Sequence, residues 1–239
     1  MKTIIFIQAR ENSTRLPGKV LKKLCGKSII QIIFERMKKI HKIHKIILIT
    51  GPQSINNNLT SESKKIGLDY FCGSENNLLD RFYHASKFFE ADNIIRITAD
   101  NPFSDINLIN HAIDIFENGN YQILSNNRIR TYPIGLNFEI FTSESLKLAW
   151  NDEKKNFRNT NFSDLIMSPT KYMLYSGKFI NYDLVNNENL SKIRLTIDTL
   201  DDFNNATKYF NKIYPNNPFF NLKDIIKYID MESKGDKIK

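Results

Sequence analysis

The chain has 239 residues, of which 41% are hydrophobic and 25% are charged, and its formal net charge is +8. This composition is ordinary for a soluble globular protein. No apolar stretch approaches the roughly 20 residues that a membrane helix needs, and the first apolar run, Ile4–Ile7, is too short for a signal peptide. We therefore expect a cytoplasmic protein with no membrane partner.

The positive charge by itself is compatible with nucleic acid, with a phosphate-rich small substrate or with solvated lysines on helix faces. The lysines are spread along the chain, and no aromatic residues interleave with a basic stripe. Because no nucleic-acid-binding signature is present either, we expect no nucleic-acid partner. Cys25 and Cys72 form no CxxC spacing, so neither a disulfide framework nor a zinc site is expected.

Apolar, β-rich runs alternate along the chain with segments of helical periodicity. Several runs are almost continuously apolar, which is typical of strands that are covered on both faces. The predicted strands are Thr3–Ala9, Lys45–Thr50, Leu68–Phe71, Asn93–Thr98, Tyr121–Ser125, Leu136–Phe141, Lys171–Tyr175 and Ile193–Ile197.

Helices are predicted between these strands. Ser28 and Gln31 have the spacing of a capping box at the head of the first helix, and apolar residues then recur at helical spacing as far as Ile40. The other predicted helices are Asn77–Phe89, Asn107–Glu117, Glu144–Trp150, Leu200–Phe210 and Leu222–Ile229.

This alternation predicts an α/β fold with a doubly wound, mostly parallel sheet. No linker or break in composition divides the chain, so residues 1–239 are expected to form a single domain. The pattern is less regular from about residue 126 to 190, where we expect an insertion.

The loop after the first strand carries the strongest local signal. Ligands of open α/β sheets bind beyond the carboxyl ends of the strands, where this loop lies. Arginine forks match phosphate oxygens in pairs, and lysine acts as a point charge. The loop therefore predicts a triphosphate site, although a surface loop with solvated charges is the alternative. It lacks both GxxxxGK[ST] and GxGxxG. Its polar groups come from Arg10, Ser13, Thr14, Arg15 and Lys19.

Two aspartates follow predicted strands and are candidate metal ligands. Asp100 follows the strand that ends at Thr98, and Asp198 follows the one that ends at Ile197. Carboxylates at two strand ends can share one Mg²⁺, which prefers carboxylate, water and phosphate oxygens. The alternatives are a turn aspartate at Asp100 and a helix N-cap at Asp198. Asp201 and Asp202 are interpreted as charges of a helix's first turn.

Five segments, in order from about residue 3 to about residue 203, resemble the cytidylyltransferase family. That family includes CMP-Kdo and CMP-acylneuraminate synthetases and the spore-coat polysaccharide type. The segments are IQARENSTRLPGKVL, FCGSENNLLDRFY, RITADNPF, YPIGLNFEIF and RLTIDTLDD. Ile134 and Asn137 stand where the family pattern has acidic residues.

The resemblance implies a nucleotide-diphospho-sugar transferase (Rossmann-like) fold, with the segment around 126–190 as a small antiparallel acceptor-side or dimerisation arm. It implies a homodimer that uses Mg²⁺ and transfers CMP from CTP to a small anionic acceptor, such as a sugar acid or a phosphorylated or phosphonate compound, in surface glycan biosynthesis. The implied nucleotide-binding residues are Ala9, Arg10, Ser13, Thr14, Arg15, Lys19, Arg81 and Thr98. Arg10, Lys19 and Asp100 are the expected catalytic residues, Asp100 and Asp198 the metal ligands, and Gly135, Asn137 and Arg194 the acceptor-binding residues.

Two other interpretations remain open from the residues. Arg81 can instead form a helix-surface pair with Asp80. A glycosyltransferase with a nucleotide-sugar donor is the alternative function, but Asp100-Asn101-Pro102 is not the DxD motif of such enzymes. A silent binding module is disfavoured because every charged residue of the first loop is present.

Overall fold

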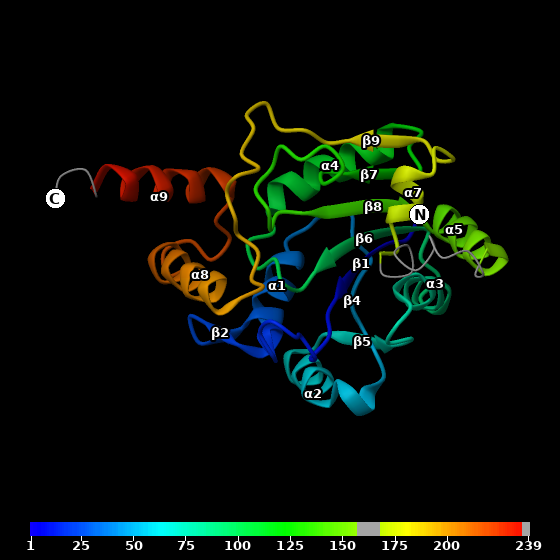
Figure 1. Cartoon of the computed structure of the whole chain (residues 1–239), viewed down its shortest axis with the longest axis horizontal. Coiled ribbons are helices and arrows are strands. Elements are labelled where there is room, and N and C mark those ends of the chain that lie inside the picture. Colours follow the sequence, from blue (N-terminus) through cyan, green and yellow to red (C-terminus); the bar gives the residue numbers. More distant parts are fainter. Residues whose placement is uncertain (157–167, 236–239) are drawn as a thin grey trace.

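The computed structural model describes residues 1–156 and 168–235. In this part of the chain a seven-stranded sheet forms the centre of the molecule (Figure 1). All its strands run in one direction except β8, which is antiparallel to both its neighbours. The predicted mostly parallel sheet is therefore confirmed. The strand order is β5 (Asp69–Cys72), β4 (Lys45–Thr50), β1 (Thr3–Gln8), β6 (Asn93–Thr98), β8 (Phe138–Thr142), β7 (Ile123–Ser125) and β9 (Asn181–Asp183).

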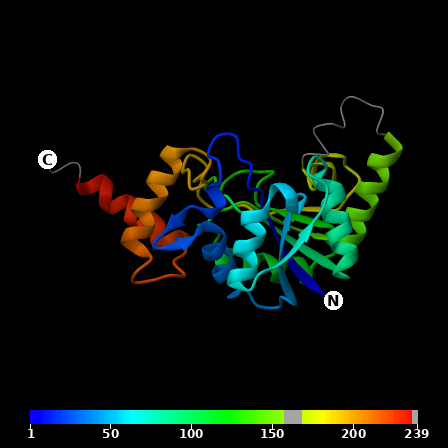
Figure 2. The ribbon, with the colours of Figure 1, turned by 90° about the horizontal axis from the view of Figure 1, so that it is seen from below.

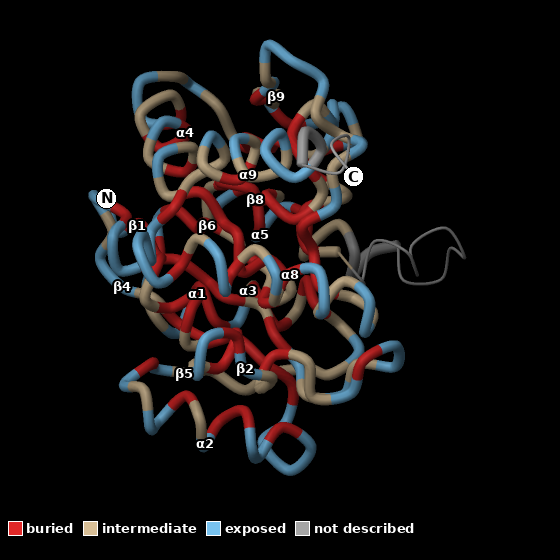
Figure 3. Tube along the Cα trace, turned by 90° about the vertical axis from the view of Figure 1, so that its left-hand side faces the viewer, coloured by how far each residue is buried: buried red, intermediate tan, exposed pale blue. Residues whose placement is uncertain are grey.

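Helices cover both faces of the sheet. Side chains alternate between the two faces of a strand, so Ile5 and Ile7 join one apolar core whereas Ile4 and Phe6 join the other. The tube in Figure 3 is accordingly buried along the central strands. One face packs against α1 (Ile29–Met37), α2 (Asn57–Ile66) and α4 (Ile106–Asn118), and the other against α3 (Leu78–Phe88), α5 (Ser143–Asn156) and α7 (Lys171–Tyr175).

The last two helices lie at one end of the molecule, opposite α5 (Figure 2). They are α8 (Leu200–Ile213) and α9 (Leu222–Gly235), and Phe210 and Ile225 anchor them in the larger core. None of the described helices has the length and apolarity that crossing a membrane requires.

The helix starts differ in detail from the sequence prediction. Ser28 does cap α1, because its side chain accepts from the Gln31 N–H at 3.3 Å. The predicted capping box is incomplete, since the Gln31 side chain donates to Glu35 instead. A complete capping box opens α8, where Thr199 and Asp202 satisfy each other's backbone N–H groups.

Two predicted strands are wrong. Lys171–Tyr175 is the helix α7, and its consecutive residues Met173 and Leu174 are both buried. A run of five residues is too short for its period to separate strand from helix. The segment Ile193–Ile197 is no strand of the sheet and forms only an isolated bridge, between Arg194 and Ile134. At its end the Ile197 N–H donates to the Asp100 carbonyl, just beyond β6.

Several short elements were not predicted. They include α2, β9, the 3₁₀ turns Lys19–Leu21 and Gln53–Ile55, and a small antiparallel pair, β2 (Lys23–Leu24) with β3 (Lys27–Ser28). This pair precedes α1 and lies outside the 126–190 segment. The described part of that segment supplies β8, α5, α7 and β9 to the main body.

Candidate active site

A cavity of about 320 Å³ opens at the carboxyl ends of β1 and β6. Its walls combine the first loop, the start of α3, the end of β6 and the segment before α8, which are far apart in sequence. Every residue predicted to bind a nucleotide or metal is among the lining residues. The complete set of residues that line the cavity is Gln8, Ala9, Arg10, Ser13, Thr14, Arg15, Lys19, Val20, Glu75, Leu78, Arg81, Arg96, Thr98, Ala99, Asp100 and Asp198.

Glu11 holds the first loop in place. Its carbonyl accepts from the Gly18 N–H at 3.2 Å, which closes the loop on itself. Its carboxylate accepts from the Asn58 and Leu59 N–H groups at the start of α2, both at 3.1 Å. Gly18 has φ 64°, a left-handed conformation that glycine adopts without steric cost. The turn at Gly18 delivers Lys19 to the cavity.

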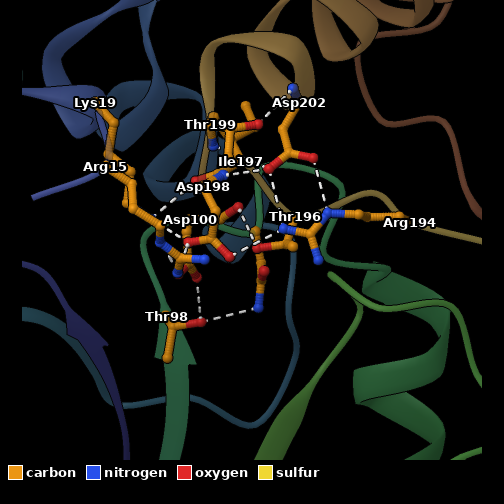
Figure 4. A network of polar contacts seen from close by, with 11 residues as sticks. Arg15, Lys19, Thr98, Asp100, Arg194, Thr196, Ile197, Asp198, Thr199 and Asp202 are labelled. Carbon is orange, nitrogen blue, oxygen red and sulfur yellow. Dashed lines mark hydrogen bonds and ion pairs between the residues drawn. The ribbon is translucent and has the colours of Figure 1, made fainter. Parts of the chain in front are cut away.

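Lys19 joins the two predicted metal ligands. Its ammonium lies 2.9 Å from Asp198 Oδ1 and 3.3 Å from Asp100 Oδ2, and it donates to the Ile197 carbonyl at 2.8 Å (Figure 4). The Lys19 side chain is only 12% exposed. Asp100 and Asp198 are therefore positioned to share a cation, and the chain's own ammonium occupies the place between them.

Asp100 is oriented from its own strand. The Thr98 hydroxyl donates to Asp100 Oδ1 at 2.6 Å, and the Asn101 amide donates to Thr98 Oγ1 at 2.9 Å. Asp100 Oδ1 is thus held by Thr98, and Asp100 Oδ2 contacts the Lys19 ammonium. This arrangement points the carboxylate into the cavity.

Asp198 is surrounded by cations. Arg15 Nη2 lies 3.0 Å from its Oδ1, and Arg194 Nη2 lies 3.1 Å from its Oδ2. Burial acts to raise the pKa of Asp198, but the hydrogen bond from Lys19 and the charges of Lys19 and Arg15 outweigh it and lower that pKa. Asp198 is therefore held as a carboxylate. The alternative that it caps α8 is wrong, because Thr199 is the N-cap.

Asp202 and Arg194 hold Asp198 in position through hydrogen bonds to its backbone and its carboxylate. Asp202 Oδ2 accepts from the backbone N–H groups of Asp198 and Thr199, each at 2.9 Å. Arg194 Nε donates to Asp202 Oδ1 at 2.8 Å, and this hydrogen bond is the main reason that the pKa of Asp202 lies below its ordinary value. Figure 4 shows Arg194 on the opposite side of Asp198 from Arg15 and Lys19.

Arg81 is buried, with 2% of its side chain exposed, so the helix-surface alternative is wrong. Its guanidinium donates to the carbonyls of Ser74 at 2.7 Å and Glu75 at 3.1 Å. Burial lowers its pKa, and the neighbouring charge of Arg10 acts in the same direction. Arg81 therefore fixes the loop before α3 while it lines the cavity.

The predicted acceptor-binding residues do not line this cavity. Gly135 has φ 108°, and a Cβ there would lie 2.4 Å from the Thr196 backbone nitrogen, so close chain approach requires glycine. Asn137 Oδ1 is buried without a hydrogen-bond partner. Arg194 contacts Asp198 and Asp202 instead. A role of Gly135, Asn137 and Arg194 in binding an acceptor stays a prediction.

Among the polar lining residues, sequence reasoning missed Gln8, Glu75 and Arg96. A signal for Arg96 exists in the sequence, since it is the one charged residue of the strand NIIRIT and lies between isoleucines. Its partners Gln8 and Glu139 come from different strands and become visible only when the strands are paired.

The donor set fits a divalent cation held together with a phosphate. The described residues contain no cluster of three or more His, Cys, Asp or Glu side chains that could cage a metal. Mg²⁺ commonly takes one or two protein carboxylates and completes its shell with water and substrate phosphate. Asp100 and Asp198, already sharing a cation beside a loop rich in guanidinium groups, match that requirement.

Known proteins are similar to this chain in sequence and in fold. A family model described as cytidylyltransferase matches residues 4–229. Uncharacterized protein MJ1063 of Methanocaldococcus jannaschii is 35% identical over all of this chain and 93% of its own length. Spore coat polysaccharide biosynthesis protein SpsF of Bacillus subtilis is 33% identical over 61% of this chain and 62% of its own.

A solved cytidylyltransferase structure from Leptospira borgpetersenii superposes with a TM-score of 0.89 and 28% identity, covering 98% of this chain and 96% of that one. The predicted nucleotide-diphospho-sugar transferase fold is thereby confirmed.

Proposed function

The chain belongs to the cytidylyltransferase family, as its five sequence segments predict, and on this basis we propose that it transfers CMP from CTP to a small anionic acceptor with Mg²⁺. Nucleotidyl transfer as the type of reaction follows from the family. One observation carries the rest: Lys19, Asp100 and Asp198 meet in a cavity walled by the cationic first loop. We further propose that residues 1–239 act as a single nucleotidyltransferase domain.

The first loop is proposed to hold the triphosphate. Arg10 and Arg15 offer guanidinium forks, and Ser13, Thr14 and the backbone from Ala9 onward offer smaller donors. Charge-assisted hydrogen bonds of this kind are roughly twice as strong as neutral ones. The Arg15 side chain is 63% exposed and so can turn toward phosphate.

Asp100 and Asp198 are the proposed ligands of Mg²⁺, with Thr98 and Arg194 fixing their carboxylates. When bound, Mg²⁺ neutralises charge on the phosphates and draws electron density from the α-phosphorus. Lys19 then leaves the two carboxylates for the phosphates, a short movement at the end of a flexible side chain. Positioning and charge neutralisation supply most of such catalysis.

In the proposed reaction an acceptor oxygen attacks the α-phosphorus. A new P–O bond forms, the bond between the α-phosphorus and the bridging oxygen breaks, and pyrophosphate leaves in line. A hydroxyl acceptor gives its proton to a carboxylate of the site, whereas a phosphate acceptor needs no base. Arg10, Arg15 and Lys19 stabilise the charge of the departing pyrophosphate.

A sugar acid, a sugar phosphate or a phosphonate is the proposed acceptor, with Gly135, Asn137 and Arg194 on its side of the site. The similarity to SpsF, whose name places it in spore coat polysaccharide biosynthesis, supports a role in surface glycan synthesis. A homodimer, with the 126–190 segment at its interface, is also part of the proposal.

The primary test is pyrophosphate release from each of the four NTPs, with Mg²⁺ and a panel of sugar acids, sugar phosphates and phosphonates. We expect release with CTP only in the presence of an acceptor, because the acceptor oxygen is the nucleophile. Release with another NTP would change the base assignment. No release from any pair, together with tight binding of a nucleotide sugar, would instead favour the glycosyltransferase alternative.

Arg194→Gln is expected to weaken divalent-cation binding about 10- to 100-fold, the usual cost of losing a residue that orients a metal ligand. Mn²⁺ titration by electron paramagnetic resonance, with a non-hydrolysable CTP analogue present, measures this affinity. Arg130→Gln is the matched control, because Arg130 is exposed and, within the described part of the chain, its side chain hydrogen-bonds only to Asn127. If instead the acceptor KM rises with metal affinity unchanged, Arg194 binds the acceptor directly.

A further inference from the structure

A row of polar side chains crosses the sheet beside the cavity. In the strand register Arg96 of β6 lies opposite Glu139 of β8, which lies opposite Ser125 of β7, and Ser125 lies opposite Asp183 of β9. Paired residues of neighbouring strands share a face of the sheet. The same face carries the apolar core under α3 and α5 one row further back. The polar row therefore separates this apolar core from the cavity.

Arg96 is held from two sides with part of its guanidinium unused. Its Nε donates to Gln8 Oε1 and its Nη1 donates to Glu139 Oε2, both at 2.9 Å. Among the described residues no hydrogen bond uses its Nη2. The Arg96 side chain is 14% exposed and lines the cavity, whereas Glu139 is only 4% exposed and lies behind it.

Gln8 adds a second donor at the same place. Because Arg96 Nε donates to the amide oxygen of Gln8, the amide nitrogen is the end left over, and the described contacts give it no partner. Gln8 also lines the cavity. Two residues that line the same cavity, one of them charged, therefore each keep a nitrogen, Arg96 Nη2 and Gln8 Nε2, without a hydrogen-bond partner among the described residues.

Stability alone does not account for this pair. Burying an ion pair removes both charges from water, and apolar residues of similar volume are often as stable or more so. Apolar neighbours are available in the same strands, for instance Ile94 opposite Phe141. What Glu139 does provide is a fixed orientation for a planar donor group, which lowers the entropy lost on binding a ligand.

We propose that Arg96, oriented by Glu139 and Gln8, binds an oxyanion of the acceptor and so selects acidic acceptors. This inference rests on the proposed function. Arg96 belongs to a strand, apart from the loop that is proposed to hold the triphosphate. It lies two residues before Thr98, about 6.6 Å along a strand, and the Asp100 site follows. When the reacting oxygen of the acceptor lies at Asp100, an oxyanion several ångströms away on the same acceptor molecule therefore lies beside Arg96.

A carboxylate and a phosphate share the chemistry that this donor pair recognises. The acceptor class is therefore a sugar acid or a sugar phosphate, and neutral sugars are excluded. Arg96 is a specificity-determining residue in this scheme, and Glu139 is a positioning residue that acts through it.

The test compares wild type with Arg96→Gln/Glu139→Gln, a pair of neutral residues that leaves no lone buried charge. The probes are CTP with Mg²⁺ and a keto-deoxy sugar acid, the methyl ester of that acid, or a sugar phosphate whose reacting oxygen is a hydroxyl. Wild type is expected to prefer an acidic probe to the ester. The double variant is expected to raise the KM of that acidic probe about 10- to 100-fold, the scale of a lost hydrogen bond to a charged group, and to abolish the preference. The KM for CTP should stay within about twofold.

Two single variants separate recognition from structure. Glu139→Gln removes the counter-charge of Arg96 but keeps a side-chain oxygen that can accept the hydrogen bond from Arg96 Nη1. The guanidinium therefore stays oriented, and the KM of the acidic probe should not rise. Arg96→Lys keeps the charge but loses the fork, and should lie between wild type and the double variant. A purely structural pair would instead make all three variants less heat-stable without a selective change in acceptor KM, and that pattern overturns the proposal.

Which acidic probe responds identifies the oxyanion as carboxylate or phosphate. Wild-type turnover with an acceptor whose KM is the same in the double variant overturns the Arg96 proposal and leaves the proposed function standing. Absence of CTP-dependent pyrophosphate release from wild type with every acceptor overturns the proposed function itself, and the Arg96 proposal with it.

Discussion

Asp100→Asn is expected to lower turnover by about 10²-fold or more, the scale on which losing one preorganised charge contact reduces catalysis. Asparagine keeps the shape of the side chain and its hydrogen bond with Thr98, but it removes the negative charge that a divalent cation needs. Steady-state pyrophosphate release at saturating CTP and acceptor measures the effect.

The fold is expected to survive this change. Lys19 keeps its 2.9 Å contact with Asp198 and its bond to the Ile197 carbonyl, so no cation is left unpaired. The midpoint of thermal unfolding should therefore change little. Asp201→Asn is the matched control, because Asp201 is an exposed acid in the first turn of α8. Turnover of Asp100→Asn within about threefold of wild type would exclude Asp100 as an essential metal ligand.

Lys19→Met is expected to change two quantities in opposite directions. Turnover should fall about 10²-fold, because a positive charge that stabilises the departing pyrophosphate is lost. Metal affinity of the nucleotide-free protein should rise about 10-fold or more, since the Lys19 ammonium lies between Asp100 and Asp198 and repels a second cation from the same place. Methionine fills similar space without charge.

Mn²⁺ titration without nucleotide, followed by electron paramagnetic resonance, measures the second quantity. Lys23→Met serves as the control, because Lys23 is exposed on the short hairpin before α1. The opposite signs matter because a misfolded variant would lose both activity and metal affinity. Unchanged or weaker metal binding in Lys19→Met would mean that Lys19 does not compete for the metal position.

In the proposed mechanism the contact of Lys19 with Asp100 and Asp198 would couple the binding of metal to the binding of nucleotide. While Lys19 neutralises Asp100 and Asp198, an isolated divalent cation gains little from binding between them. The triphosphate gives the ammonium another partner, so each ligand makes binding of the other more favourable. Such coupling is reciprocal by thermodynamic necessity.

Local patterns in the sequence were sufficient to predict the central strands, the first loop and the position of Asp100. The apolar runs at β1, β4 and β6 needed no tertiary information, because a strand buried on both faces has almost no polar residues. The first loop and Asp100 follow β1 and β6 directly, so their place at the carboxyl edge followed from the parallel sheet. The family resemblance, confirmed by the match over residues 4–229, rested on these same local segments.

The tertiary structure decided which side chains meet. Lys19 and Asp198 are 179 positions apart, and Arg96 and Glu139 are 43 apart, so no local pattern could pair them. The helix α7 was mistaken for a strand because five residues do not define a period. Sequence by itself determined the central strands, most of the longer helices and the charged groups that chemistry requires, because these depend on neighbours along the chain. Their distances, burial and partners depend on how the strands pair and on which segments the core brings together.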